Sequence, residues 1–183
     1  MKPDQFWTVI FGCSAPVEIE IGAGRGAFLF AAATAVPAHN FLAIEHSATR
    51  AARLTRDSGQ RALVNVRVLH ADAGCVVEQL VPDNSVAAYH IYFPDPWWKR
   101  KHYKRRLFTP SFVAALGRSL APGGRVYVAT DVERYFQEIV GLLGERLQPD
   151  EAPRPHAIVT RFEQKALVRG ATTHAAVFRK AMA

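Results

Sequence analysis

Short apolar and β-branched runs alternate along the chain with longer segments in which apolar residues recur at helical spacing. The short runs predict five strands, at residues 17–21, 41–45, 66–69, 86–93 and 126–129. The longer segments predict four helices, at residues 26–35, 48–57, 111–120 and 133–146. Beyond them the pattern predicts a loop, a helix and a last strand, at residues 149–155, 160–169 and 174–179. Strands and helices therefore alternate through most of the chain.

This alternation predicts an α/β fold built on one mostly parallel sheet. The strands are apolar almost throughout, which is typical of a parallel sheet covered by helices on both faces. The length of 183 residues suits one compact unit, so we expect a single domain spanning 1–183. Ligands of such sheets bind beyond the carboxyl ends of the strands, near the point where the strand order reverses. The polar residues at that edge are the candidates for function.

Composition excludes several classes of protein. Hydrophobic residues make up 49% and charged residues 21%, which is typical of an ordinary globular protein and not of a disordered or fibrous one. The chain has no apolar stretch near the roughly 20 residues that a membrane span needs, and its first residues do not resemble a secretory signal. Cys13 and Cys75 are too few for a disulfide framework or a typical zinc cluster. We therefore expect a cytoplasmic protein without a bound metal, either a monomer or a homodimer.

Positive charge is concentrated in one segment. Lys and Arg number 23 against 16 Asp and Glu, a net charge of +7, and residues 99–106 carry six of the cations with no acid. Removing those six charges from +7 leaves +1 for the rest of the chain. A concentrated cationic patch favours a polyanionic partner, most simply a nucleic acid, although a solvated loop would also account for it.

The first predicted strand runs into a glycine-rich turn, Gly22-Ala23-Gly24-Arg25-Gly26-Ala27, which satisfies the G-x-G-x-x-G/A pattern with Ala27 at its last position. By itself this pattern is weak, because a purely structural turn would also use glycine. Glu45 ends the second strand, where an acid can accept hydrogen bonds from ribose hydroxyls. Asp72 follows the third strand, where it could meet the amine of an adenine. Together these features predict a cofactor that contains adenosine.

Two acids just before the glycines distinguish between cofactors. Glu18 and Glu20 would repel the pyrophosphate of a dinucleotide, but they suit the sulfonium and ammonium of S-adenosylmethionine. The sequence therefore favours S-adenosylmethionine over NAD. Glu20, closer to the turn, is assigned to the cofactor, and a contribution from Glu18 is left open.

The fourth strand ends in the strongest motif of the chain, Phe93-Pro94-Asp95-Pro96-Trp97-Trp98-Lys99. Its two prolines fix the backbone and the direction of Asp95. A carboxylate beside an indole suits a purine, which can stack on the ring and donate hydrogen bonds to the acid. Trp97 could equally well pack the loop. With the cations that follow, the motif predicts a nucleobase site with a phosphate track leading to it.

These motifs resemble those of the bacterial tRNA (guanine-N7)-methyltransferases, across roughly residues 5–165. The resemblance implies a Rossmann-like class I methyltransferase fold with a sheet of the seven-stranded type, S-adenosylmethionine as cofactor and tRNA as partner. Its cofactor contacts would be Glu20, Gly22, Gly24, Gly26, Glu45, Asp72, Ala73 and Asp95. Asp95 would also be the catalytic residue. Its substrate contacts would be Lys99, Asp131, Thr160, Arg161, Phe162 and Glu163.

The resemblance also implies the reaction, methylation of guanine N7 at position 46 in the variable loop of tRNA. Guanine N7 carries a lone pair and no proton, so alignment, rather than a strong base, would drive the reaction. Asp95 would position the guanine edge or the cationic end of the cofactor, and Asp95 or Asp131 would stabilise the charge that the base gains. No histidine is assigned a catalytic role.

The sequence departs from the family in two places and leaves rival functions open. About 16 residues precede the first strand, fewer than family members often carry, and residues 164–170 lack the expected glycine and tryptophan pattern, so we expect differences in tRNA docking and in closure of the guanine pocket. The rivals are an amino-methyltransferase acting on adenine or cytosine and a non-catalytic RNA-binding subunit. An NAD-dependent oxidoreductase would share the glycine pattern but would not need the cationic patch.

Overall fold

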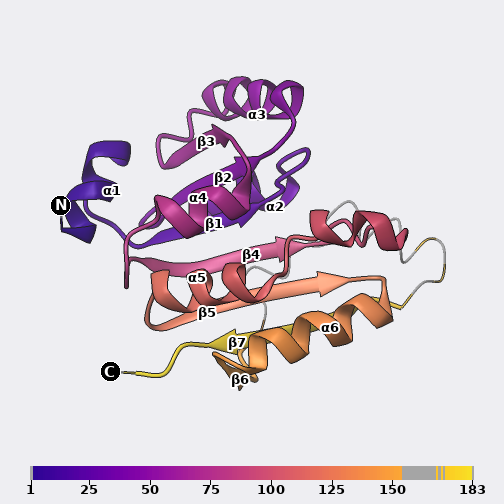
Figure 1. Ribbon diagram of the computed structural model, residues 1–183. Coiled ribbons are helices and arrows are strands. Elements are labelled where there is room, and N and C mark those ends of the chain that lie inside the picture. Colours follow the sequence, from indigo (N-terminus) through magenta and orange to yellow (C-terminus); the bar gives the residue numbers. More distant parts are fainter. Residues whose placement is uncertain (1, 154–167, 169, 171, 183) are drawn as a thin grey trace.

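The computed structural model describes residues 2–153, 168, 170 and 172–182, except for the side chain of Arg100. One sheet of seven strands runs through it in the order β3-β2-β1-β4-β5-β7-β6 (Figure 1). The strands are β1 (Val17–Ile21), β2 (Asn40–Glu45), β3 (Val66–His70), β4 (Val86–Tyr92), β5 (Leu120–Thr130), β6 (Gln148–Asp150) and β7 (His174–Arg179). The helices are α1 (Pro3–Phe11), α2 (Ala27–Ala35), α3 (Ala48–Gln60), α4 (Ala73–Gln79), the 3₁₀ helix η1 (Arg100–Arg105), α5 (Pro110–Ser119) and α6 (Glu133–Gly144).

The first five strands are parallel, as the sequence predicts. β1 pairs with β2 on one side and with β4 on the other, so the strand order reverses between β1 and β4. β7 enters antiparallel between β5 and β6. A ligand site is therefore expected above the carboxyl ends of β1 and β4, which point to the right in Figure 1.

Helices cover both faces of the sheet, again as predicted. On one face, Phe28 and Leu29 of α2 and Leu54 of α3 pack in one core cluster. On the other face α1, α4, α5 and α6 contribute to a second, larger cluster, which includes Phe112 and Ile139. In Figure 1, α4, α5 and α6 lie in front of the sheet and α2 lies behind it.

Four elements differ from the sequence-based prediction. α1, α4 and η1 were not predicted, and β6 lies where a loop was expected. α4 has only seven residues and includes a glycine and two valines, so its helix propensity is low, and its burial of Val76 and Val77 stabilises it instead. β5 begins six residues earlier than the predicted strand at 126–129, and within this added part its pairing with β4 jumps from Leu120 to Arg125 and Gly123 has φ +74°.

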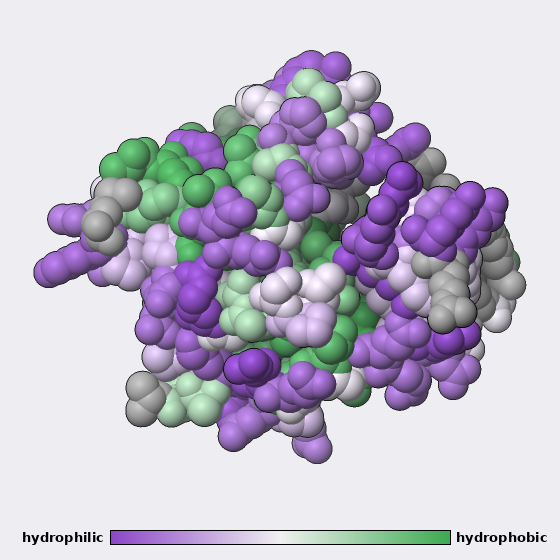
Figure 2. Space-filling view, in the orientation of Figure 1, coloured by the Kyte–Doolittle hydropathy of each residue, from purple (hydrophilic) through white to green (hydrophobic). Residues whose placement is uncertain are grey.

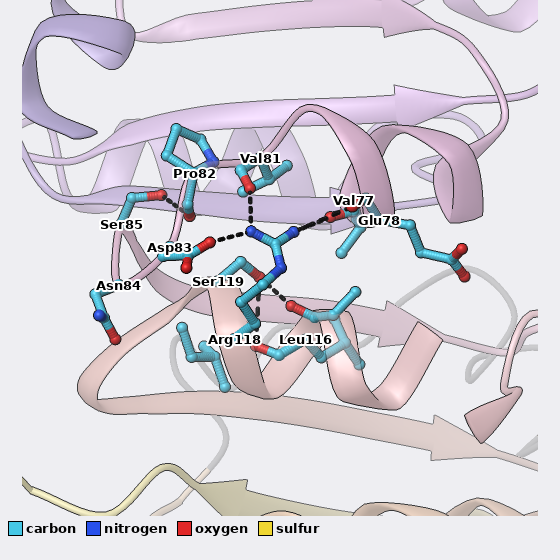
Figure 3. A network of polar contacts seen from close by, with 12 residues as sticks. Val77, Glu78, Val81, Pro82, Asp83, Asn84, Ser85, Leu116, Arg118 and Ser119 are labelled. Carbon is cyan, nitrogen blue, oxygen red and sulfur yellow. Dashed lines mark hydrogen bonds and ion pairs between the residues drawn. The ribbon is translucent and has the colours of Figure 1, made fainter. Parts of the chain in front are cut away.

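Arg118 of α5 holds the end of α4 at the opposite edge of the sheet (Figure 3). Its guanidinium donates to the carbonyl oxygens of Val77 and Val81, both at 2.9 Å, and pairs with Asp83. These bonds satisfy carbonyl groups that the end of a helix leaves unpaired. Arg118 thus belongs to the scaffold.

No helix in the described part of the chain is long and apolar enough to cross a membrane.

Candidate functional site

The parallel strands deliver the predicted residues to one edge of the sheet. The glycine turn follows β1, Glu45 is the last residue of β2, and Asp72 lies between β3 and α4. Asp95 follows β4, and Asp131 follows β5 directly. The carboxyl ends of parallel strands meet at the same edge, so the sequence-based grouping of these acids is confirmed at the level of the backbone.

The glycine turn has a left-handed backbone at each of its three glycines, with φ of +74° at Gly22, +58° at Gly24 and +77° at Gly26. The first and the last have different reasons to be glycine. A Cβ added at Gly22 would meet nothing within 4 Å, so open space lies above that residue. A Cβ at Gly26 would lie 2.5 Å from the Phe30 ring and 2.7 Å from Leu54, so this glycine lets α2 pack closely. Gly22 therefore leaves room for a ligand, whereas Gly26 does not.

Glu45 holds the turn in place. Its carboxylate accepts hydrogen bonds from the backbone N–H of Gly24 at 3.0 Å and of Ser47 at 2.9 Å, and Arg50 donates to it at 3.3 Å. The residue is only 2% exposed. Each oxygen therefore already has a protein donor, and a ribose would use the remaining lone pairs.

Glu20 is a buried acid that lacks a full set of partners. Its Oε2 atom has no hydrogen-bond partner among the described residues. Burial raises the pKa of Glu20 to about 8, the Leu29 backbone N–H opposes this rise, and the negative charge of Glu45 adds to it. Such a carboxyl group suits a cationic ligand, which would supply both the missing partner and the compensating charge.

Glu18 shares the face of β1 with Glu20 but is fully engaged by the protein. One oxygen lies 2.7 Å from Nε2 of His90 and the other 2.6 Å from Nδ1 of His39. Burial raises the pKa of Glu18, but the hydrogen bonds and charges of the two histidines outweigh burial, so the pKa lies below its usual value. Between the two acids, Glu20 is the one with capacity for a ligand.

Asp72 has a structural role as well as a position at the site. It is the N-cap of α4, and its side chain accepts a hydrogen bond from the Cys75 backbone N–H at 2.9 Å. Ala73 is the first residue of that helix. The Asp72 side chain is exposed, and its contact to an adenine amine stays a prediction.

The loop after β4 is irregular and exposes its acid. Phe93 and Trp97 have positive φ, +52° and +45°, which is unusual for residues with large side chains. Asp95 between them is exposed. The Trp97 ring packs against η1: its centroid lies 5.7 Å from that of the His102 ring and 5.1 Å from the Arg105 guanidinium carbon. Of the two roles considered for Trp97, the structure shows the packing role.

The six cations after this loop do not all face solvent, so the predicted phosphate track needs a correction. Arg106 was expected to contact phosphate, but its side chain is only 10% exposed and pairs with Glu138 of α6. Burial and the ion pair already occupy that guanidinium, so its contacts do not favour the expected phosphate contact. Lys101, Lys104 and Arg105 are exposed, at the end of the molecule where hydrophilic side chains gather over η1 (Figure 2).

The structure describes two of the predicted substrate contacts. Lys99 and Asp131 are both exposed, Lys99 just before η1 and Asp131 just after β5. The other four, together with the predicted helix at 160–169, lie wholly or largely outside the described residues: Thr160, Arg161, Phe162 and Glu163.

Comparison with known proteins identifies the family. Residues 14–176 match the model of a family described as "Putative methyltransferase". The tRNA (guanine-N(7)-)-methyltransferase of Burkholderia thailandensis is 38% identical over 98% of this chain and 69% of its own. The enzyme of the same name from Psychromonas ingrahamii is 36% identical over 87% of this chain and 68% of its own. The chain belongs to the tRNA (guanine-N(7)-)-methyltransferase family. The family assigned from the motifs is confirmed.

Solved structures confirm the fold class of this tRNA (guanine-N(7)-)-methyltransferase family member. The 16S rRNA methyltransferase KamB superposes with a TM-score of 0.70 over 97% of this chain and 94% of its own, at 14% sequence identity. A SAM-dependent O-methyltransferase from Thermotoga maritima gives a TM-score of 0.61 over 98% of this chain and 65% of its own, at 18% identity. The Rossmann-like methyltransferase fold with its seven-stranded, mostly parallel sheet is therefore established.

Sequence reasoning missed several residues that shape the site in this methyltransferase. Arg50 donates to Glu45, and His39 and His90 engage Glu18. Arg50 lies three residues after the Ser47 helix cap, a spacing that places it near the end of β2. The partners of Glu18 come from β4 and from the loop before β2, and no local pattern brings these segments together.

Proposed function

We propose that the chain transfers a methyl group from S-adenosylmethionine to guanine N7 in tRNA, at position 46 of the variable loop, in the cytoplasm. The names of the relatives support this reaction. The position of the glycine turn and of the Asp95 loop at one edge of the sheet supports that edge as the site of the reaction. The observation that carries most weight is that the Asp95-Pro96-Trp97 loop, with exposed cations after it, follows the strand that pairs with the one leading into the glycine turn. The same arrangement gives no reason to prefer adenine or cytosine as the target.

The residues present fit S-adenosylmethionine. Gly22 leaves open space above the turn. Two residues earlier in the chain, the Oε2 atom of Glu20 is buried and has no hydrogen-bond partner among the described residues. Glu20 would bind the cationic end, Glu45 the ribose and Asp72 the adenine amine, with Gly24, Gly26 and Ala73 shaping the backbone around them. When bound, the cofactor supplies a methyl group activated by a positively charged sulfur. A cationic ligand is what the acids at this edge favour.

The residues of the chain would mainly align the guanine with the methyl group and stabilise the charge that forms on the base. Guanine N7 offers a lone pair without a proton, so no side chain needs to act as a strong base. Asp95, fixed between two prolines, would orient the guanine edge or the cofactor's cationic end. The base becomes positively charged as it is methylated, and the carboxylates of Asp95 and Asp131 would stabilise that charge. Lys99 would contact the guanosine or its phosphate, and residues 160–163 would complete the pocket.

The test is methyl transfer to an unmodified tRNA transcript, followed by identification of the methylated nucleoside by mass spectrometry. We expect 7-methylguanosine from the normal transcript and none from a transcript with adenosine at position 46. Methylation of adenine or cytosine would overturn the assignment of the base. Binding of tRNA without calorimetric binding of S-adenosylmethionine would indicate a non-catalytic subunit. Full activity in both Asp95→Ala and Asp131→Ala would refute the roles of these acids.

A further inference from the structure

Arg106 occupies an unusual position for a residue in a basic run. Its guanidinium carbon lies 3.9 Å from the ring centroid of Tyr103 on η1 and 4.8 Å from that of Tyr135 on α6. Its Nε donates a hydrogen bond of 2.8 Å to the carbonyl oxygen of Pro96, and its Nη1 pairs with Glu138. One side chain thus combines two aromatic contacts, a backbone hydrogen bond and an ion pair.

These contacts join two segments that lie next to the proposed site acids. Pro96 belongs to the loop after β4 and directly follows Asp95. Tyr135 and Glu138 belong to α6, which begins two residues after Asp131. Arg106 therefore sets the distance between the loop of one proposed site acid and the helix that follows the other.

The Asp95 loop depends on support from outside itself. Two of its residues are prolines, which have no backbone N–H to donate, and two others have positive φ. Two hydrogen bonds to its backbone are the 2.7 Å bond from the Phe93 N–H to the Ala129 carbonyl oxygen and the bond from Arg106 to the Pro96 carbonyl oxygen. The first holds the start of the loop, and the second holds it immediately after Asp95.

A contact between Arg106 and RNA phosphate would cost the contacts that this side chain already makes. To reach RNA the side chain would have to leave Glu138 and both rings, whereas Lys101, Lys104 and Arg105 are already exposed. A planar guanidinium can stack between rings while donating in two directions, and a lysine ammonium cannot reproduce this geometry.

We propose that Arg106 and Glu138 form a positioning clamp that fixes the Asp95 loop against α6, and that the clamp supports turnover instead of binding RNA phosphate. This inference rests on the proposed methyl transfer. Because the reaction depends on alignment, a displaced Asp95 lowers the rate of transfer while leaving the binding of tRNA and cofactor nearly intact. Arg106 and Glu138 are thus positioning residues and touch neither substrate.

The experiment compares Arg106→Gln, Arg106→Lys and Glu138→Gln in methyl transfer to an unmodified tRNA transcript. Enzyme concentrations are set by the S-adenosylmethionine sites counted by calorimetry, so that unfolded protein does not lower the apparent rate. The matched control is Arg134→Gln, because Arg134 lies 3.6 Å from the same Glu138 but its side chain is 80% exposed. We expect kcat to fall at least tenfold in both Arg106 variants and less in Glu138→Gln. KM for tRNA should stay within about twofold, and Arg134→Gln should match the wild type.

A raised KM with unchanged kcat in Arg106→Gln, together with a salt slope of tRNA binding lowered by about 0.7–0.9, would show a phosphate contact and overturn the clamp. An unchanged kcat in all three variants would overturn it as well. If the wild type transfers no methyl group to tRNA, the proposed function fails, and hydrogen exchange then tests the clamp alone. Faster exchange at the Asp95 and Trp97 amides in Arg106→Gln and Glu138→Gln than in Arg134→Gln would support the clamp, and equal exchange would refute it.

Discussion

Protonation of Glu20 provides a sharp test of the cofactor site, because one carboxyl group links pH to both stability and ligand binding. Burial raises its pKa to about 8 from an ordinary value of 4.5. At pH 7, one unit below that value, about nine in ten molecules carry the proton. A ligand cation that needs the carboxylate must therefore displace a proton.

The effect on stability has a definite sign. The folded protein holds the Glu20 proton more tightly than the unfolded chain, so the contribution of Glu20 to the free energy of unfolding decreases as pH rises from 4.5 to about 8. The steepest decrease is about 1.4 kcal/mol per pH unit. Glu20→Gln cannot ionise, so it should lose this dependence and be more stable than the wild type above pH 8 when no ligand is bound.

The effect on binding follows from the same pKa. Binding of S-adenosylmethionine at pH 7 should release up to about 0.9 proton from Glu20, and the release should disappear above about pH 9. Titration calorimetry in buffers of different ionisation enthalpy measures this number. In Glu20→Gln, affinity should fall and the Glu20-dependent proton release should vanish. Equal affinity and equal proton release in wild type and Glu20→Gln would refute the assignment of Glu20 to the cofactor.

Three further predictions test other parts of the structure. Replacing Lys101, Lys104 and Arg105 by Gln should lower the log–log salt slope of tRNA binding by about 2–2.7 without changing affinity for S-adenosylmethionine, and an unchanged slope would make these cations a solvated surface. Glu45→Gln should weaken calorimetric binding of S-adenosylmethionine by about 1–3 kcal/mol and also loosen the glycine turn, and unchanged affinity would remove Glu45 from the site. Arg118→Ala should lower the free energy of unfolding in urea by about 1.5–3 kcal/mol while kcat stays normal, because it leaves partly buried carbonyl groups of α4 and the following turn without a donor. An unchanged urea midpoint would show that these hydrogen bonds do not stabilise the fold.

The fold was predictable because the sequence patterns that define each strand and helix lie within or next to that element. Apolar strands and helix caps such as Ser47 lie within a few residues of the elements they define, and the expected last strand, 174–179, is the observed β7. α4 was missed because its seven residues have little propensity of their own and depend on burial of Val76 and Val77. Its one local sign was Asp72, which the sequence argument used only as a ligand contact.

The places of the candidate residues at the strand ends were predictable for the same reason, whereas contacts between residues distant in sequence were not. The glycine turn and the acids at the strand ends are placed by the fold class itself, so their positions followed once the strands were identified. The sequence could not show that His39 and His90 engage Glu18 and leave Glu20 with an unpartnered oxygen. Those contacts join residues up to 72 positions apart, and they decide which of two similar acids can serve a ligand.

The basic run shows how burial separates residues that composition treats alike. Arg105 and Arg106 are adjacent and chemically identical, yet the guanidinium of Arg105 lies over the ring of Trp97 near the surface while that of Arg106 lies between two tyrosines. The end of the short 3₁₀ helix accounts for the difference. Arg106 is the extended residue that follows this helix, its N–H donates to the carbonyl oxygen of Tyr103 at 3.0 Å, and its guanidinium lies over the rings of Tyr103 and of Tyr135 in α6. An excess of charge in a sequence therefore predicts a cationic surface but not its members, because the local backbone geometry decides which cations are exposed and which are buried against the protein.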